Sequence, residues 1–317
     1  MRKRVALLDP FQGEMLETVR AAFEHGGFEL VVVADRSDSA QSAALDGADY
    51  AIPVSVPLRA TNLPSHDRLR LVHKWGAGVD TVDVEALAAR GIPLLRTAGA
   101  NAVYVAELAL ALMIMARRNL GAADRDTHLG RWDGATHWTE SSSIVGKTVG
   151  LIGYGAIART LESYLVPFGC KVVRSTRIRD TSEGNLPLTE LLQVADVVSL
   201  HVPLNATTRG MIGIDQLAQM KPDSTLINTA RGPLVDEIAL VEALRNATIG
   251  SAGLDVFNTE PLPEEHPLRS LKNVVLTPHL GGKVRENLVG VVDHIITNLL
   301  LYEAGRPLPT QDLVTGG

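Results

Sequence analysis

Short apolar runs alternate along the chain with longer segments in which apolar residues recur every three or four positions. The runs are rich in Val, Leu and Ile, which is typical of strands, and the longer segments are typical of helices. Strand–helix alternation at this rhythm predicts parallel sheets joined by right-handed crossovers. We expect about eleven strands, at residues 5–8, 30–34, 50–54, 69–74, 93–96, 148–152, 171–175, 197–201, 225–228, 251–254 and 274–277.

Eleven strands are more than one such sheet usually holds, so we expect two α/β units. The first runs to about residue 98, and a long helix at 101–119 leads into the second. One more amphipathic helix follows at 285–305. The polar segment 121–143 has no clear period and holds Trp132 and Trp138. It is either an exposed loop or an arm whose tryptophans bury against a partner subunit.

Composition narrows the class of protein. The 317 residues are 45% hydrophobic but only 4% aromatic, so the hydrophobic residues are mainly Ala, Val, Leu and Ile. This composition is typical of parallel sheets covered by helices. A net charge of −6 without a basic block argues against a nucleic-acid partner. The single cysteine, Cys170, excludes an internal disulfide and a Cys-rich metal site, and we expect no metal. The apolar stretches at 5–8 and 105–116 are too short for a signal peptide or a membrane span, so we expect a cytoplasmic protein without membrane association.

The clearest local motif is a glycine-rich turn after the strand at 148–152. Gly153 permits the tight turn, Gly155 lets the backbone approach a pyrophosphate, and Ala158 lets the following helix lie close to the strand. The pyrophosphate would lie at the helix N-terminus, where free amides and the positive end of the dipole face it. Because the turn lies between a strand and a helix, it predicts dinucleotide binding.

The end of the next strand bears on the choice between NAD and NADP. An NAD-binding protein usually has an acid here, about 20 residues past the glycines, to bind the ribose hydroxyls. This chain has Thr176 and Arg177 instead, a hydroxyl and a guanidinium that suit a 2′-phosphate. A solvated basic turn is the structural alternative, and Asp180 would be the ribose acid in a different register. The pattern favours NADP over NAD.

Three further strand ends carry polar residues with complementary chemistry. Arg231, Glu260 and His279 each follow a predicted strand, on the edge where an open α/β sheet binds its ligand. Arginine can hold a carboxylate through two hydrogen bonds, and histidine can exchange a proton near neutral pH. A neighbouring carboxylate would orient the imidazole and favour its protonated form. Each residue alone could be structural, as a turn histidine, a capping arginine or a loop charge, and their joint position favours catalysis.

Taken together, these segments resemble the D-isomer-specific 2-hydroxyacid dehydrogenases. The matching segments are 149–158, 228–232, 255–261 and 277–282, with 76–80 and 195–204 in their usual places, so the resemblance covers essentially the whole chain. It implies two Rossmann-like, doubly wound α/β domains. The dinucleotide-binding domain, 100–284, would be inserted into a discontinuous substrate-binding domain of residues 1–99 and 285–317.

The resemblance also assigns roles. It implies a substrate site in the cleft between the domains, with Arg231 on the substrate carboxylate and keto oxygen, His279 as the acid/base and Glu260 as its partner. Backbone amides at Ala77 and Gly78 would bind the substrate carboxylate, and segment 121–143 would be a dimerisation arm, which implies a homodimer. Together with the two turns above, the expected cofactor contacts are Gly153, Gly155, Ala156, Ile157, Thr176, Arg177, His201, Pro203, Thr208, Thr229, Ala230, Asp255 and Gly281.

The expected activity is hydride transfer between NADP or NAD and a small 2-oxo acid, of the glyoxylate or hydroxypyruvate type. Formate dehydrogenases of the superfamily have glutamine where this chain has Glu260, which argues against that activity. Two alternatives stay open. One is 3-phosphoglycerate dehydrogenase, although no phosphate-binding cluster is evident around Arg96. The other is a dinucleotide-sensing binding protein like the corepressors of this family, which can keep the catalytic residues.

Overall fold

The computed structural model describes residues 2–177 and 184–315, which form two compact units. Unit 1 comprises Met1–Asn101 and Val284–Gly317, and unit 2 comprises Ala102–Lys283. Unit 1 is therefore made of two separate stretches of chain, with unit 2 inserted between them. The sequence had set the boundaries at 99 and 285. The binding roles assigned to the two units stay predictions.

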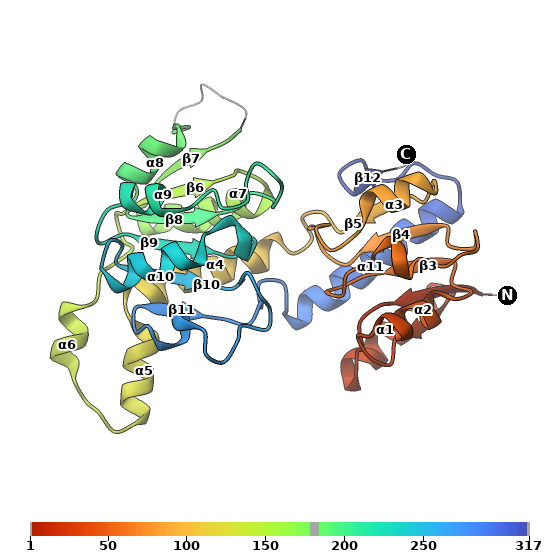
Figure 1. The fold of residues 1–317 in the computed structure, drawn as a ribbon, viewed down its shortest axis with the longest axis horizontal. Coiled ribbons are helices and arrows are strands. Elements are labelled where there is room, and N and C mark those ends of the chain that lie inside the picture. Colours follow the sequence, from red (N-terminus) through yellow and green to blue (C-terminus); the bar gives the residue numbers. More distant parts are fainter. Residues whose placement is uncertain (1, 178–183, 316–317) are drawn as a thin grey trace. The chain divides into compact units, whose positions relative to one another are not determined.

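Within the described residues, unit 1 is built on a six-stranded sheet with the order β12-β5-β4-β3-β1-β2 (Figure 1). Neighbouring strands are parallel except for β12, which pairs antiparallel with β5. The strands are β1 (Lys3–Leu7), β2 (Phe28–Val32), β3 (Tyr50–Ile52), β4 (Leu71–Lys74), β5 (Leu94–Arg96) and β12 (Leu313–Thr315).

Helices cover both faces of the unit 1 sheet, because successive strand side chains point to opposite faces and both sets are apolar. Val5 and Leu7 of β1 pack with α1 (Gly13–His25) and α11 (Arg285–Glu303). Ala6 between them packs on the other face, with α2 (Asp38–Leu45) and α3 (Val84–Ala89). The second stretch of chain thus supplies part of the unit 1 core, through the buried Val291, Val292, Ile295, Ile296 and Leu299 of α11. A short 3-10 helix, η1 (Ala60–Asn62), lies in the loop after β3.

The described part of unit 2 holds a second six-stranded sheet, with the order β11-β10-β9-β8-β6-β7 and parallel pairing throughout. The chain runs from β6 outward to β7 and then returns to β8 on the other side of β6. This reversal makes a switch point between β6 and β8, where open α/β sheets bind ligands at the carboxyl ends of the strands. The strands are β6 (Thr148–Ile152), β7 (Lys171–Ser175), β8 (Val197–Leu200), β9 (Thr225–Asn228), β10 (Ser251–Leu254) and β11 (Val274–Leu276).

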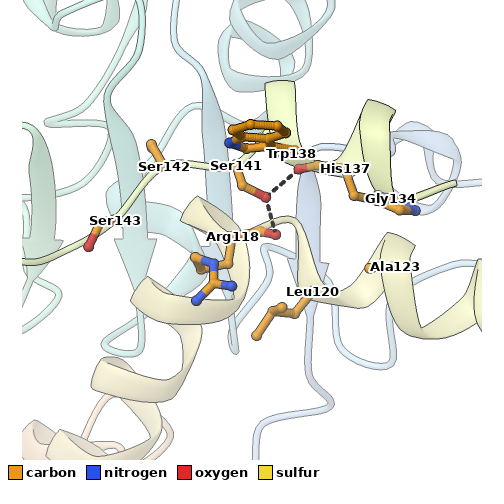
Figure 2. Close-up of a pocket in the computed structure, with 9 residues that line it drawn as sticks. All are labelled: Arg118, Leu120, Ala123, Gly134, His137, Trp138, Ser141, Ser142 and Ser143. Carbon is orange, nitrogen blue, oxygen red and sulfur yellow. Dashed lines mark hydrogen bonds between the residues drawn. The ribbon is translucent and has the colours of Figure 1, made fainter.

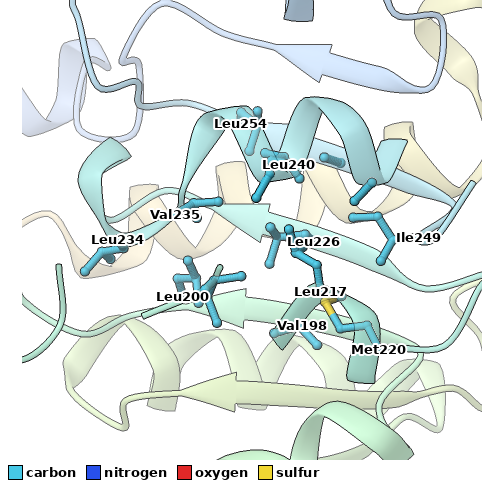
Figure 3. Close-up of a cluster of buried hydrophobic side chains, with 14 of the residues drawn as sticks. Val198, Leu200, Leu217, Met220, Leu226, Leu234, Val235, Leu240, Ile249 and Leu254 are labelled. Carbon is cyan, nitrogen blue, oxygen red and sulfur yellow. The ribbon is translucent and has the colours of Figure 1, made fainter. Parts of the chain in front are cut away.

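Both faces of the unit 2 sheet are also covered. One face packs against α4 (Ala102–Arg117) and α7 (Ala156–Leu165). The other packs against α8 (Leu188–Val194), α9 (Ile214–Gln219) and α10 (Glu237–Arg245), and Figure 3 shows part of this second cluster. Three 3-10 helices complete the unit: η2 (Val166–Phe168), η3 (Gly232–Leu234) and η4 (Pro267–Ser270).

The predicted α/β fold class with two parallel sheets is confirmed, and all eleven predicted strands are present. Three elements were not predicted. Segment 121–143, expected to be an exposed loop or an arm, contains most of α5 (Leu120–His128) and all of α6 (Gly134–Thr139), and the third element is β12. Among the described residues, no helix combines the length and apolarity that crossing a membrane requires.

Candidate active site

Most of the residues nominated from the sequence lie at the carboxyl edge of the unit 2 sheet. Gly153 follows β6, Thr176 follows β7 and His201 follows β8. Arg231 lies three residues beyond β9, and His279 three residues beyond β11. Because parallel strands end on the same edge, one sheet brings the cofactor candidates and the catalytic candidates to the same side.

The glycine turn after β6 has the backbone geometry that the sequence required. Gly153 has φ +89°, and a Cβ there would lie 2.8 Å from both the carbonyl carbon and the oxygen of His201. Any other residue would therefore push β6 away from the end of β8 at the switch point. A Cβ at Gly155 would meet nothing within 4 Å, which leaves open space beside the turn.

The helix after this turn can accept an anion. Gly155 is the N-cap of α7, and Ala156 and Ile157 are its first two residues. Within the described residues no side chain caps this helix, so the amides of its first turn are available to a ligand. This geometry fits the pyrophosphate of a dinucleotide.

A basic cluster surrounds Tyr154 beside the end of β7. The guanidinium carbon of Arg174 lies 4.5 Å from the centre of the Tyr154 ring, and that of Arg159 lies 5.9 Å away. The Tyr154 hydroxyl donates a hydrogen bond to Glu162, and this bond raises the pKa of the tyrosine. Arg177 is exposed just beyond Thr176, whose hydroxyl lies 3.4 Å from Asn185 Oδ1. Asp180, the alternative ribose acid, lies outside the described residues.

Glu260 and His279 form a hydrogen-bonded pair. His279 Nδ1 lies 2.7 Å from Glu260 Oε2, and Glu260 Oε1 accepts a hydrogen bond of 3.0 Å from the Phe257 amide. Partial burial raises the pKa of the Glu260 carboxyl, but the bonds from His279 and Phe257 and the charges of His279 and Arg231 outweigh it, so the pKa lies below its usual value. The carboxylate is therefore ionised at neutral pH, and it orients the Nδ1–H of His279 toward itself.

The buried Asp255 shapes the loop that carries His279. Its carboxylate accepts hydrogen bonds from the Thr277 hydroxyl (2.7 Å), the Leu280 amide (2.7 Å) and the Gly281 amide (2.9 Å). His279 itself has φ +54°, in the left-handed region that non-glycine residues seldom adopt, and its amide donates to Asp255 O at 2.9 Å. The family resemblance had implied Asp255 as a cofactor contact. This second role, holding a strained histidine, gave no sequence signal of its own.

Arg231 and Glu260 are brought together by an unusually close backbone contact. A Cβ on Gly232 would lie 2.0 Å from the carbonyl carbon of Phe257 and 2.5 Å from the Asn258 nitrogen, so only glycine fits. The turn after β9 therefore packs directly on the segment that leads to Glu260. Asn228 Nδ2 donates to Arg231 O at 2.8 Å, which fixes the backbone of Arg231 from the other side. The three predicted catalytic residues thus share one neighbourhood in unit 2.

The remaining cofactor candidates have mixed surroundings. The buried Thr229 hydroxyl has no hydrogen-bond partner among the described residues, so it is available to form a hydrogen bond with a ligand. His201 Nε2 lies 2.9 Å from the Ser199 hydroxyl, and burial lowers the pKa of His201 to about 4, so its ring is neutral. The hydroxyl of Thr208 already donates to Pro203 O at 2.7 Å. The Ala230 amide donates to Asn228 Oδ1 at 3.1 Å.

Ala77 and Gly78 belong to unit 1, in the loop after β4. This loop turns at Gly76, which has φ +106°, and the Thr97 amide donates to Gly76 O at 3.1 Å. The structure therefore joins the loop after β4 to the end of β5. Substrate binding by the two amides stays a prediction.

A cavity of about 490 Å³ lies away from these residues, between the end of α4, helices α5 and α6 and the segment after them. Figure 2 shows Ser141 at its centre, with its hydroxyl 2.9 Å from Arg118 O and 2.5 Å from His137 O. The residues that line it are all different from those nominated for cofactor or catalysis: Arg118, Leu120, Ala123, Gly134, His137, Trp138, Ser141, Ser142 and Ser143.

Known proteins resemble this chain in sequence and in structure. The family model described as D-isomer specific 2-hydroxyacid dehydrogenase, NAD binding domain, matches residues 110–281. A glyoxylate reductase from Korarchaeum cryptofilum is 35% identical over 261 residues, which is 80% of this chain and 79% of that protein. A glycerate dehydrogenase from Methylorubrum extorquens is 35% identical over 269 residues, 83% and 85% of the two chains.

The fold is similar to a solved relative. The NADPH-dependent glyoxylate/hydroxypyruvate reductase from Sinorhizobium meliloti, in complex with NADP and malonate, matches with a TM-score of 0.85 and 29% identity. The match covers 100% of this chain and 98% of that one.

Proposed function

Because the chain belongs to the D-isomer-specific 2-hydroxyacid dehydrogenase family, we propose that it transfers hydride between NADPH and a small 2-oxo acid. The observation that carries this proposal is the Glu260–His279 pair, with a 2.7 Å hydrogen bond, on the sheet edge that also bears the Gly153 turn. A proton donor and a pyrophosphate-binding turn on one edge are what a dehydrogenase of this kind requires.

In this proposal the bound cofactor supplies the hydride that adds to the keto carbon. His279 supplies the proton. Its Nδ1–H is oriented toward Glu260, so Nε2 of the protonated ring is the acid that gives its proton to the keto oxygen as the new C–H bond forms. Arg231 binds the substrate and stabilises the negative charge that develops on that oxygen. The neutral imidazole then regains a proton from solvent, and in the oxidising direction the same nitrogen accepts the hydroxyl proton.

NADPH is preferred in this proposal because of the residues at the end of β7. The turn presents Thr176 and the exposed Arg177 where NAD-dependent enzymes place an acid. Arg159 and Arg174 beside Tyr154 add positive charge to the same region. A 2′-phosphate would meet a guanidinium that makes strong, charge-assisted hydrogen bonds, whereas the ribose diol of NADH would find no carboxylate among the described residues of this turn.

Glyoxylate and hydroxypyruvate are the proposed substrates. Similar proteins named glyoxylate reductase and glyoxylate/hydroxypyruvate reductase support this choice. The test is a panel of 2-oxo acids of increasing side-chain length and charge, including 3-phosphohydroxypyruvate, assayed with NADPH and NADH in parallel. We expect the highest kcat/KM for glyoxylate or hydroxypyruvate with NADPH. Fastest turnover of the phosphorylated acid would instead make the chain a 3-phosphoglycerate dehydrogenase, and tight NADPH binding without turnover would make it a dinucleotide-sensing protein.

We further propose that the protein is a homodimer in the cytoplasm, joined through the arm formed by α5 and α6. Trp132 and Trp138 are 90% and 83% exposed, and Leu129 is 61% exposed, so three large apolar side chains project from one short segment. Light scattering on the wild type and on a Trp132→Ser/Trp138→Ser variant tests this. A wild-type monomer at micromolar concentration would refute the dimer.

A further inference from the structure

A second glutamate–histidine pair lies beside the segment that carries Glu260. Glu237 is the first residue of α10, and its Oε1 accepts a hydrogen bond of 2.7 Å from the Asn258 amide. Its Oε2 lies 3.5 Å from His266 Nε2. The side chains of Glu237 and His266 are only 13% and 18% exposed. A largely buried carboxylate held by one amide and one imidazole has a defined orientation.

The tautomer of His266 follows from its second contact. The Leu268 amide donates to His266 Nδ1 at 3.3 Å, so Nδ1 is an acceptor and the ring proton is on Nε2. That Nε2–H faces Glu237. His266 is itself fixed in place as the N-cap of η4. The pair therefore has an anchor at each end, in α10 and in η4.

Glu237 and Glu260 bind two successive amides of the segment from Phe257 to Glu260. The Phe257 amide donates to Glu260, and the next amide, Asn258, donates to Glu237. Gly232 packs against the peptide that joins these two residues, which leaves that backbone no room to shift toward β9. A change in the position of the Asn258 amide must therefore move Phe257 and, with it, the carboxylate that orients His279.

We propose that Glu237, supported by His266, is a positioning residue for the Glu260–His279 pair. The proposal rests on the proposed function for its kinetic consequences, but the geometry of the pair does not depend on which substrate is reduced. Removing the Glu237 side chain frees the Asn258 amide and lets the Phe257–Glu260 segment drift. Because active-site misplacement of about 1 Å can cost about a hundredfold in rate, a loss of this kind is measurable.

A neighbouring cavity makes room for the variants that the test needs. A cavity of about 320 Å³, lined in part by Glu237, Asn258 and His266, borders the pair. Water can therefore reach the Asn258 amide when the glutamate is absent, so Glu237→Ala is expected to fold. Glu237→Gln keeps an oxygen acceptor for the amide and loses only the charge that faces His266. Glu242→Ala is the matched control, since Glu242 lies on the same helix, is 59% exposed and contacts Arg245.

The experiment measures kcat, KM, NADPH affinity and the pH dependence of kcat for each variant. We expect Glu237→Ala to lower kcat about ten- to a hundredfold, in the range of active-site misplacement, and to leave the NADPH Kd within about twofold. In wild type kcat should decline as pH rises, because reduction needs protonated His279. In Glu237→Ala this decline should move to lower pH, because His279 is then less well paired with the Glu260 carboxylate, and Glu260→Gln, which removes that charge, should shift it in the same direction. Glu237→Gln should recover kcat to within about threefold of wild type, and Glu242→Ala should match wild type.

A double variant separates positioning from a general structural effect. If Glu237 acts through Glu260, adding Glu237→Ala to Glu260→Gln should cause little further loss of kcat, because both changes act on the same pairing of Glu260 with His279. Full additivity, or an unchanged pH profile in Glu237→Ala, would overturn the proposal.

A readout without turnover keeps the test independent of the proposed function. In NMR spectra of protein with labelled histidines, the His279 ring signals of Glu237→Ala should change at a pH displaced from wild type toward that of Glu260→Gln. If the wild type turns over no 2-oxo acid, the proposed function fails, and this displacement alone then decides whether Glu237 positions the pair. Identical His279 signals in wild type and Glu237→Ala would refute it.

Discussion

Cofactor choice gives the sharpest prediction, and it depends on Arg177. This side chain is exposed beyond the end of β7, while Arg174 and Arg159 are held against Tyr154 at 4.5 and 5.9 Å. Arg177 is therefore the guanidinium with most freedom to meet a 2′-phosphate. Hydrogen bonds to charged groups contribute about 1.5–3 kcal/mol, so Arg177→Ala should weaken NADPH binding about 10- to 150-fold.

NADH lacks the 2′-phosphate, so its affinity should change less than about twofold, within the reach of a screened surface charge. Lys171→Ala is the matched control. Lys171 is exposed at the start of β7, about 20 Å from Arg177 along the strand, beyond the Debye length of about 8–10 Å, yet its loss changes the net charge equally. Fluorescence titration of both cofactors into wild type, Arg177→Ala and Lys171→Ala gives the six affinities needed. Equal weakening of NADPH and NADH by Arg177→Ala, or a wild-type preference for NADH, would refute this assignment and turn attention to Asp180.

The residues at the carboxyl edge of the unit 2 sheet give three further predictions. His279→Ala should lower kcat at least about a hundredfold, the usual contribution of a general acid, and leave NADPH affinity within a few fold; a variant that keeps most of its kcat would remove His279 from the mechanism. Reduction needs protonated His279, so kcat should decline as pH rises. Glu260→Gln removes the negative charge beside His279 and should move this decline to lower pH. Coincident pH–rate profiles of wild type and Glu260→Gln would argue against the pairing. Gly232→Ala should destabilise the fold by several kcal/mol, because its Cβ would lie 2.0 Å from the Phe257 carbonyl carbon, and urea unfolding that shows less than about 1 kcal/mol of change would contradict that contact.

The inner strands of unit 2 could be predicted closely because they are buried on both faces. β6, β9 and β10 begin and end where they were predicted to, since a strand covered by helices on both sides has no exposed polar face that would obscure its limits. Helix α5 was missed because its sequence is polar and short, with Ala122 as its buried residue. Strand β12 is defined mainly by its pairing with β5, and three residues carry no pattern of their own.

The residues of the candidate site also differ in how much of their role the local sequence pattern indicates. Arg231, Glu260 and His279 could be nominated because each follows a strand, and strand ends converge on one edge whatever the loops between them do. Glu237 and His266 gave no such signal, because they begin a helix and cap a 3-10 turn. Their meeting depends on how α10 packs beside the segment after β10, which no local pattern specifies.

The discontinuous build of unit 1 has a consequence for biosynthesis. Unit 2 is one uninterrupted stretch and can complete its core as soon as residue 283 has left the ribosome. Unit 1 begins earlier but needs α11, whose Val291, Ile295 and Leu299 fill one side of its core. At about 5–20 residues per second, its first 101 residues wait roughly 10–40 s for that helix, with the apolar faces of α1 and the strands uncovered. Unit 1, whose first stretch is translated before unit 2, is thus the unit that folds last. We therefore expect chaperones to bind the nascent chain at unit 1.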